Sequence, residues 1–362
     1  SGTQLVMSLR RMNRIRSVEP LNNSLVVEAG CILKEIQRAA ESVDRYFPLS
    51  LGSEGSCTIG GNLSTNAGGV NVLRYGMTRE LTLGLEVVLS DGRVISTLSA
   101  LRKDNTGYDL RQWFIGAEGT LGVITAASLK LFPLPKRHGT AIVAIPSVKC
   151  AVELLAELRA GSGDRVSSFE LLPRAALELV DRHLGARVDI SPSSPWCVLC
   201  EVSSSDAEDS IDERLASLLE AAMEKGLITD ALLAQSERER SAFWFIRENI
   251  PEAQRRDGQS VKHDVSLPID RLAEFVDRAS DWVVTHVPEG FLVCYGHVGD
   301  GNLHFNINQR AGTDRAAFVA HGPALKRAVH DLVREFAGSF SAEHGIGRLK
   351  VDELARYAPP VE

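Results

Sequence analysis

The chain has 362 residues, a formal net charge of −7 and a pI of about 5.8. The length predicts two domains, and 44% hydrophobic with 24% charged residues is typical of a globular protein rather than a disordered one. The acidic balance argues against nucleic acid or an anionic membrane surface as the main partner. No apolar run reaches the roughly 18 residues of a spanning helix, so no transmembrane segment is expected.

The cysteines fit a reducing compartment, and the basic N-terminus fits folded protein. The six cysteines show no framework spacing. Cys197 and Cys200 form a C-x-x-C inside a strand-like run, where positions three apart face opposite sides, so we interpret both as core residues. The arginine-rich N-terminus resembles a targeting segment but continues without a cleavage or linker signal into the run at 24–29. We therefore expect it to be folded.

The first 135 residues are rich in glycine and contain short apolar runs. The predicted elements are strands at 24–29 and 83–89, an amphipathic helix at 32–43, and a strand pair or one long bent strand at 121–132. The run Pro-Leu-Pro-Lys-Arg at 133–137 then breaks the pattern and marks a boundary.

The rest of the chain alternates strands with longer helices. The predicted strands are 141–145, 197–202, 291–295 and 303–307, and the predicted helices are 147–160, 210–225, 269–286 and 320–340. Ser147 is the expected N-cap of the first helix. Long helices with a mainly antiparallel sheet predict an α+β fold. We expect three parts: residues 1–137, a substrate (cap) domain at 138–320, and a C-terminal helical segment with a turn at 321–362.

Two glycine-rich segments predict a site for a nucleotide cofactor. The first, residues 52–76, matches neither G-x-G-x-x-G nor the P-loop pattern. It nevertheless concentrates small residues, Asn and hydroxyls, whose backbone N–H groups can point inward together around a pyrophosphate or a flat ring. The second lies at 105–124. Each alone is explained equally well as a turn-rich loop, whereas two in one domain favour a bound cofactor.

Two segments far apart in the chain predict one metal site. Residues 296–304 place His297 and His304 on either side of a Gly-Asp-Gly turn between strand-like runs, so a hairpin would bring both imidazoles to neighbouring strand ends. A later turn adds Glu343 and His344. Two histidines and one carboxylate leave coordination positions open, as in catalytic divalent-metal sites. From spacing alone, histidines near a turn are more often surface or hydrogen-bonded residues, and that alternative stays open.

Two basic residues lie in otherwise apolar stretches. Arg247 precedes a helix break at Pro251, and Lys262 lies in a predicted strand at 260–265. Cations are costly to bury unless an anion pairs with them. A substrate carboxylate is one candidate, and an internal salt bridge is the alternative that the sequence alone favours.

Together these motifs resemble one family, the flavin-linked D-2-hydroxy-acid dehydrogenases of the vanillyl-alcohol-oxidase type. The resemblance covers almost the whole chain and is carried by residues 11–14, 59–62, 65–69 and 101–110 and by both segments of the expected metal site. The D-2-hydroxyglutarate branch is most similar, and the D-lactate branch is next. The resemblance implies that 1–137 is part of an FAD-binding domain whose upstream half lies outside this sequence, as does a C-terminal tail. The chain is therefore expected to be a fragment, with FAD binding weakened or lost in this form.

The resemblance also assigns site residues. It implies a divalent ion, expected to be zinc, on His297, His304 and Glu343, with His344 as general base. The implied substrate-binding residues are Arg247, Lys262 and Asn306. The residues expected to hold FAD non-covalently are Ser56, Cys57, Ile59, Gly60, Gly61, Asn62, Thr65, Asn66, Ala67, Gly69, Tyr75, Gly76, Asn105, Gly107, Tyr108, Glu118, Gly119, Gly122, Ile124 and Asn302.

The expected function is that of an oxidoreductase: a flavoprotein that oxidises a D-2-hydroxy acid to the 2-oxo acid and passes electrons to an unidentified acceptor. Two basic residues beyond the metal favour a diacid, D-2-hydroxyglutarate. Pro251 stands where the hydroxyglutarate enzymes have a hydroxyl residue, which removes a hydrogen bond to the substrate and keeps D-lactate as the alternative. A non-catalytic scaffold of the actin-interacting type is the alternative from another class. A homodimer is the expected assembly, and the resemblance implies a mitochondrial location, although no presequence is visible.

Overall fold

The computed structural model describes residues 5–359, and the contacts divide the chain into two units. The first unit holds residues 1–135 together with 343–349, and the second holds residues 136–342 together with 350–362. The three-part division expected from the sequence stays a prediction.

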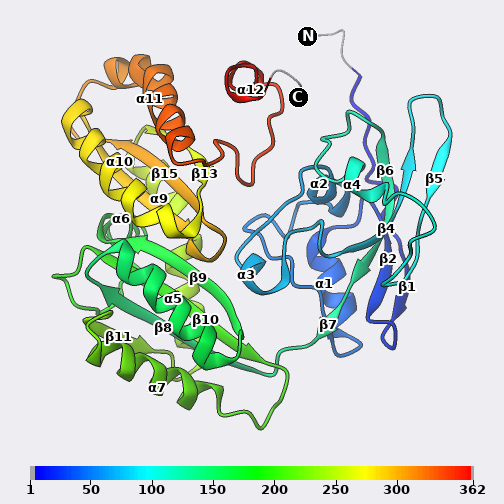
Figure 1. The fold of residues 1–362 in the computed structure, drawn as a ribbon, viewed down its shortest axis with the longest axis horizontal. Coiled ribbons are helices and arrows are strands. Elements are labelled where there is room, and N and C mark those ends of the chain that lie inside the picture. The colour runs from blue at the N-terminus through cyan, green and yellow to red at the C-terminus, as the bar shows by residue number, and fades with distance from the viewer. Residues whose placement is uncertain (1–4, 360–362) are drawn as a thin grey trace. The chain divides into compact units, whose positions relative to one another are not determined.

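The first unit is built on an antiparallel sheet (Figure 1). Among the described residues, its five strands run in the order β1-β2-β6-β4-β5. They are β1 (Ile15–Glu19), β2 (Ser24–Glu28), β4 (Thr82–Val88), β5 (Val94–Ser96) and β6 (Val123–Lys130), and β3 (Arg45–Tyr46) pairs separately with β7 (Phe132–Pro133). The predicted strands at 24–29 and 83–89 are confirmed as β2 and β4, and the run at 121–132 becomes β6 followed by β7.

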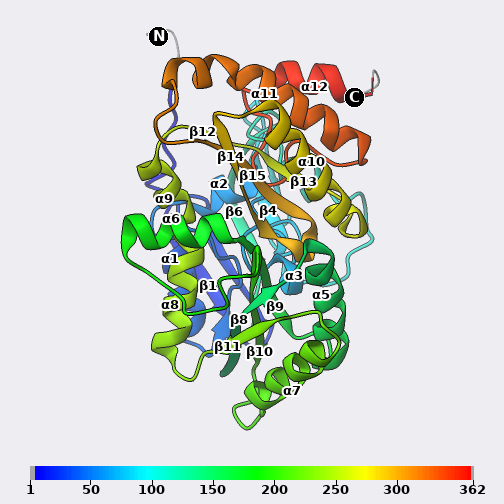
Figure 2. The ribbon, with the colours of Figure 1, turned by 90° about the vertical axis from the view of Figure 1, so that its left-hand side faces the viewer.

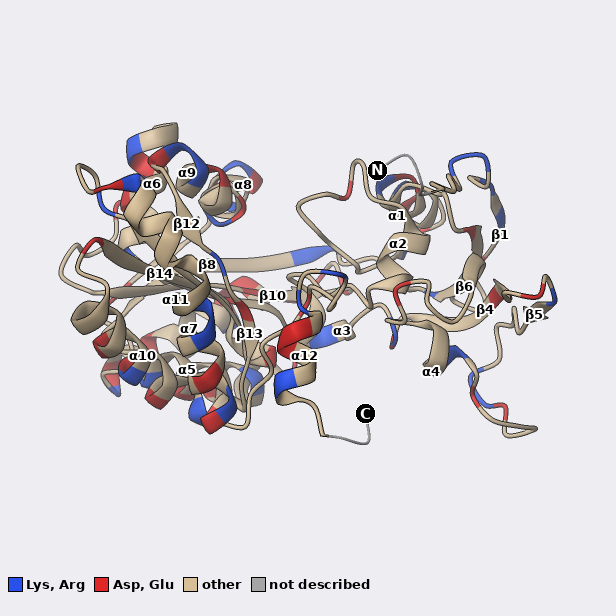
Figure 3. Cartoon of the chain, turned by 90° about the horizontal axis from the view of Figure 1, so that it is seen from above, with Lys and Arg blue, Asp and Glu red and all other residues tan. Residues whose placement is uncertain are grey.

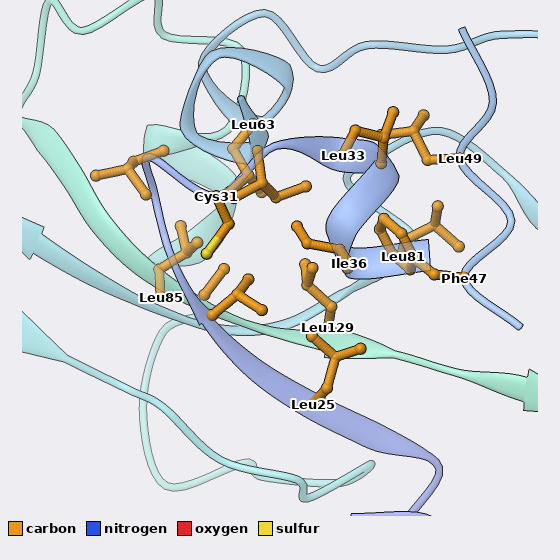
Figure 4. Close-up of a cluster of buried hydrophobic side chains, with 14 of the residues drawn as sticks. Leu25, Cys31, Leu33, Ile36, Phe47, Leu49, Leu63, Leu81, Leu85 and Leu129 are labelled. Carbon is orange, nitrogen blue, oxygen red and sulfur yellow. The ribbon is translucent and has the colours of Figure 1, made fainter. Parts of the chain in front are cut away.

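One amphipathic helix provides much of the first unit's core. The helix α1 (Leu33–Glu41) confirms the helix predicted at 32–43. Its side chains Leu33, Ile36 and Ala40 repeat at helical spacing and lie in one fully buried cluster with Leu129 of β6 (Figure 4). The remaining helices of this unit are short: α2 (Ile59–Ser64), α3 (Val72–Tyr75) and α4 (Arg111–Phe114).

The basic N-terminal segment belongs to the folded sheet, as predicted. Arg14 and Arg16, at the start of β1, both pair with Glu28 of β2, at 2.9 and 3.4 Å. Arg16 also pairs with Glu86 of β4 at 3.1 Å. The hydrogen bonds from Arg14 hold the pKa of Glu28 at about 2.

The second unit contains a larger antiparallel sheet. In the part of the chain that the structure describes, it has eight strands in the order β11-β8-β10-β9-β14-β15-β12, and β13 also pairs with β15. The strands are β8 (Arg137–Ile145), β9 (Val166–Pro173), β10 (Trp196–Ser204), β11 (Asp230–Leu233), β12 (Ser260–Val261), β13 (Asp264–Ser266), β14 (Gly290–His297) and β15 (Asn302–Gln309). The predicted α+β class and the antiparallel sheet are confirmed.

Helices cover both faces of this sheet (Figure 2). One face carries α5 (Val148–Ser162), α7 (Ile211–Glu224) and α10 (Leu272–His286), and the other carries α6 (Arg174–Leu184), α8 (Glu237–Glu248) and α9 (Ile250–Asp257). The C-terminal helices are α11 (Arg315–Glu335) and α12 (Val351–Tyr357). The predicted cap is confirmed, because Ser147 Oγ accepts the backbone N–H of Cys150 at 3.2 Å.

At three places in the second unit the structure corrects or adds to the sequence analysis. The predicted strand at 260–265 is wrong as a single element: Lys262 lies exposed between β12 and β13, and the next residue, His263, is buried with its Nδ1 2.7 Å from the carbonyl of Phe305. Pro251 ends α8 as expected but then occupies the first turn of α9, where its missing N–H is tolerated. The strand β9 was not predicted. All its residues are buried, so no apolar-polar alternation marks it.

The remaining sequence interpretations concern cysteines, membranes and charge. Cys197 and Cys200 are fully buried on β10, and burial raises the pKa of the two thiols to about 11 and about 12. None of the described helices is long and apolar enough to cross a bilayer. Acidic and basic residues are mixed on α5, α7 and α9 (Figure 3), which is unlike the one-sided basic face of a nucleic-acid binder.

A buried ionic cluster attaches α8 to the sheet. The carboxylate of Glu201, on β10, accepts hydrogen bonds from Arg240 Nε at 2.7 Å and from Trp244 Nε1 at 3.0 Å. His138 Nδ1 lies 3.3 Å from its other oxygen. Burial alone would raise the pKa of Glu201, but the hydrogen bonds and charges of His138 and Arg240 outweigh it and hold this pKa at about 2.

The low pKa of Glu201 predicts that the free energy of unfolding depends on pH. Glu201 ionises more readily in the folded chain than its ordinary value of 4.5, so its contribution is complete above that pH and is lost as the pH falls toward about 2. Replacing it by Gln should therefore lower the free energy of unfolding by up to about 3 kcal/mol at pH 7. This gap between the two proteins should narrow below pH 4.5. Urea unfolding of both proteins at several pH values measures the gap, and a constant gap would contradict the assignment.

The core of the first unit gives a second prediction. Leu129→Ala, at a fully buried position of β6, should lower the free energy of unfolding by about 3 kcal/mol, because the neighbouring side chains cannot fill the cavity. Leu21→Ala in the same unit removes a side chain that is 96% exposed and serves as the matched control, with an expected change within about 0.5 kcal/mol. Equal urea midpoints for the two variants would contradict this core.

Candidate functional site

The predicted hairpin is present in the second unit and sets the geometry of its site. Strands β14 and β15 pair in a register that places Tyr295 opposite His304 and His297 opposite Asn302. Residues directly opposite in an antiparallel pair share one face, so all four side chains point toward the α8 side of the sheet. The connecting turn depends on Gly301, whose φ is +76° and where a Cβ would lie 2.0 Å from the carbonyl oxygen of Leu267.

The two histidines lie next to each other and each has a carboxylate neighbour. Their ring centroids are 5.6 Å apart. His297 Nδ1 lies 2.6 Å from Glu170 Oε1, and His304 Nδ1 lies 3.8 Å from Asp264 Oδ1. The carboxylate bonded to Nδ1 of His297 selects the tautomer in which Nε2 is the ring nitrogen that ligates a metal, whereas 3.8 Å is too long for such a bond at His304. The arrangement of the pair therefore suits a metal ion.

The third expected ligand follows from chain connectivity. Glu343 comes directly after Ala342, whose backbone N–H donates to the carbonyl of Asp264 at 3.2 Å. Asp264 is itself paired with His304 across β13 and β15. The peptide bond thus brings Glu343 toward the histidines, and ligand atoms of His297, His304 and Glu343 lie within 4.8 Å of one another. Two imidazoles and one carboxylate form a donor set suited to zinc.

Arg247 has the internal salt bridge that the sequence alone favoured. It is 6% exposed on α8, and its Nε donates to Glu170 Oε2 at 2.7 Å. Its guanidinium also lies 5.0 Å from the centre of the Tyr295 ring, within cation–π distance. Burial alone would raise the pKa of Glu170, but the charges and hydrogen bonds of His297 and Arg247 lower it to about 2.

Two buried asparagines lie on the same face. Asn306 donates to Gln254 at 3.1 Å and accepts the backbone N–H of His263 at 3.3 Å. Asn302 donates to Asp264 at 2.8 Å, while its own Oδ1 is buried with no hydrogen-bond partner within residues 5–359. An unpartnered buried carbonyl oxygen is costly, so Asn302 is suited to a bound donor. Lys262, by contrast, is an exposed residue between strands.

In the first unit, the two glycine-rich segments lie side by side. The backbone N–H of Gly116 donates to the carbonyl of Leu63 at 2.9 Å, and that of Glu118 donates to Ser64 at 2.8 Å. Asn62, on α2, is 6% exposed, and its Oδ1 has no hydrogen-bond partner in the part of the chain that is described. The segments therefore form one continuous surface with an unsatisfied acceptor, which fits the expected flavin.

The expected flavin-binding residues divide into surface and packing positions. Ile59 is fully buried, and a Cβ on Gly60 would lie 2.7 Å from that of Ala29, so both serve packing. The tight geometry of the segments places several residues at positive φ, namely Asn66, Gly69, Gly76, Glu118 and Gly119. The residues on the surface or at its edge are Ser56, Cys57, Gly61, Thr65, Asn105, Gly107 and Tyr108, of which Tyr108 is 94% exposed. Tyr75 packs edge-on against Tyr46 and Phe132.

The turn that carries the expected base is fastened to the second glycine-rich segment. The backbone N–H of Gly347 donates to Glu118 Oε2 at 2.9 Å. His344 lies exposed in this turn, three residues earlier. Glu118, expected to bind flavin, thus also fixes the turn.

The sequence reasoning missed two residues of the site, Glu170 and Asp264. Glu170 lies on the unpredicted strand β9 and pairs with His297 across β9 and β14. No local pattern marks it, because a single acid in an otherwise buried strand does not reveal its partners. Asp264 carried a signal, namely an acid inside an apolar strand-like run, which predicts a buried pairing.

Comparison with known proteins places this architecture among flavin enzymes. Residues 134–362 match the family model described as FAD linked oxidases, C-terminal domain, and residues 1–98 match the FAD binding domain. A solved structure of alkyldihydroxyacetonephosphate synthase aligns with a TM-score of 0.69, covering 91% of this chain and 62% of that one. At 16% identity, that likeness shows the fold alone.

Curated relatives are closer in sequence. The mitochondrial D-2-hydroxyglutarate dehydrogenase of Bos taurus is 42% identical over 99% of this chain and 64% of its own length, so the chain spans about two thirds of this relative. The D-2-hydroxyglutarate dehydrogenase of Xanthomonas citri pv. viticola is 35% identical over 97% of this chain and 73% of its own. The chain therefore belongs to the family of FAD-linked D-2-hydroxy-acid dehydrogenases.

Proposed function

We propose that the protein oxidises a D-2-hydroxy acid to the 2-oxo acid with FAD, and that D-2-hydroxyglutarate is the preferred substrate. The observation that carries the proposal is the grouping of His297, His304 and Glu343 beside the buried cation of Arg247. A scaffold protein would not need two imidazoles and a carboxylate grouped at metal-ligating distance, whereas a catalytic metal site does. The names of the two relatives support the choice of substrate.

Both expected cofactors fit the residues present. His297, His304 and Glu343 offer the donors of a catalytic zinc site. A bound zinc ion would lower the pKa of the substrate hydroxyl. The surface built from the two glycine-rich segments, with the orphaned oxygen of Asn62, fits FAD. FAD, when bound, supplies the redox chemistry by accepting hydride from C2 of the substrate.

The chain's own residues would bind the substrate, orient it and move its proton. His344 takes the proton of the 2-hydroxyl as general base, a role in which an imidazole nitrogen accepts the proton. Arg247, whose guanidinium is oriented by Glu170, binds a carboxylate of the substrate. Asn306, held by Gln254, contributes hydrogen bonds, and the exposed Lys262 meets the second carboxylate of a diacid.

The setting of the reaction is also a proposal. The printed name of the Bos taurus relative includes a mitochondrial location, which supports the same compartment for this protein. FAD, when bound, would pass the electrons of the substrate to a separate acceptor. A homodimer is the proposed assembly, and light scattering of the purified protein would measure it.

The first prediction of this proposal concerns the substrate. Full-length protein loaded with FAD and zinc should lose its visible flavin absorbance when mixed without oxygen with D-2-hydroxyglutarate, faster than with D-lactate and not with the L-isomers. Stopped-flow absorbance measures the rates. Faster bleaching by D-lactate would make D-lactate the preferred substrate instead. No bleaching by any acid, with both cofactors bound, would favour the non-catalytic scaffold.

The second prediction concerns the metal site. His304→Ala should abolish turnover and metal binding while FAD remains bound, because one of the two imidazole ligands is lost. His321→Ala is the matched control, since His321 lies on α11 with its side chain 61% exposed and pairs only peripherally with Glu289. Its activity and zinc content should equal those of the unchanged protein. Full turnover in the His304 variant would end the metal assignment.

A further inference from the structure

One buried carboxylate, that of Glu170, contacts both the expected metal ligand His297 and the expected carboxylate-binding residue Arg247. The two oxygens of Glu170 are divided between two partners: Oε1 lies 2.6 Å from Nδ1 of His297, and Oε2 accepts from Nε of Arg247 at 2.7 Å. All three residues are 6% exposed or less. His297 comes from β14 and Arg247 from α8, so these elements meet through Glu170 on β9.

We propose that Glu170 is a positioning residue of the active site, which orients the metal ligand His297 and the carboxylate-binding Arg247 at once. The inference rests on the proposed function and adds to it a residue outside the expected ligand set. Glu170 touches neither the substrate nor the cofactors in this assignment. It acts through the two residues that do.

The register of the sheet explains the arrangement. Glu170 lies directly opposite His297 in the pairing of β9 with β14, so its carboxylate leaves the sheet on the same face as the histidine. With Nδ1 of His297 engaged by a carboxylate, the ring is fixed in orientation and becomes a more basic ligand at Nε2. A partner of this kind typically contributes tenfold to hundredfold in metal affinity.

The second oxygen fixes the cation. A buried Arg with its Nε engaged loses rotation about the end of the side chain, so the plane of its guanidinium is set. The same carboxylate also holds the ring of His297. It therefore fixes the distance between that ring and the guanidinium of Arg247. A substrate whose hydroxyl binds at the metal and whose carboxylate binds at Arg247 requires such a fixed distance.

The chain provides a matched control on the adjacent strand. Glu201 of β10 lies on the same face, because Leu199 is opposite Glu170 and positions two apart share a face. It too is a buried carboxylate between an arginine of α8, Arg240, and a histidine, His138. His138 is not among the expected ligands. Loss of Glu201 therefore reproduces the loss of a buried charge and of a helix attachment without touching the proposed site.

The experiment compares Glu170→Gln with Glu201→Gln in the full-length protein. Zinc content is measured by elemental analysis, zinc affinity by competition with a chelator, and fold by circular dichroism and FAD content. We expect Glu170→Gln to lower zinc affinity at least tenfold and to raise the KM for D-2-hydroxyglutarate by a similar factor. We expect Glu201→Gln to keep both values and to lose only stability.

Several outcomes would overturn the proposal. Unchanged zinc affinity and KM in a folded Glu170→Gln protein would do so, as would equal losses in the Glu201 variant. Should Glu170→Gln fail to fold, Glu170→Asp keeps the charge but withdraws it by one methylene. The Glu170→Asp protein should bind zinc more weakly as well, and wild-type zinc affinity in that variant would contradict the proposal. Wild-type zinc affinity in His297→Ala would instead show that the proposed metal site itself is misplaced, a separate failure.

Discussion

The pairing register of β9, β14 and β15 is the constraint on which the rest of the second unit depends. Side chains on a strand alternate between the two faces, and a shift of one residue would turn every site residue to the opposite face. In the observed register, Glu170, His297 and His304 all leave the sheet on the α8 side. The Gly301 turn fixes this register locally, since no side chain fits against Leu267 there. The sheet thus positions the two histidines and Glu170, whereas Glu343 and His344 lie in the turn after α11.

The electrostatics of this face follow from the same arrangement. Burying a charge is costly, and the cost is offset only when partners and hydrogen bonds are complete. Helix α8 carries Arg240, Trp244 and Arg247 at positions of one helical stripe, and the sheet opposes them with Glu201 and Glu170. One of these ion pairs serves only to attach the helix. The other uses the same attachment to orient residues next to the expected chemistry.

The sequence predicted those parts of the structure whose signal is local. The helix α1, the Ser147 cap and the hairpin between His297 and His304 could be predicted because spacing and turn residues mark them. The strand β9 could not, because its sequence Val-Ser-Ser-Phe-Glu-Leu-Leu-Pro shows neither alternation nor the continuous apolar run that marks the equally buried β10. For the same reason Glu170 was missed, since its partners are 77 and 127 positions away in the chain. Lys262 was placed in one continuous strand, whereas the structure has two short strands, β12 and β13, with Lys262 and His263 between them. The family resemblance supplied the roles of the site residues, which spacing alone left open.

The backbone bonds between the two glycine-rich segments have an evolutionary consequence. The hydrogen bonds from Gly116 to Leu63 and from Glu118 to Ser64 join main-chain atoms only. Substitution of Leu63 or Ser64 leaves the backbone acceptors in place, whereas Gly116, at φ +81°, favours glycine. The shape of this surface can therefore persist while its residues drift, and a search for a fixed string of glycines would overlook many chains that fold the same way.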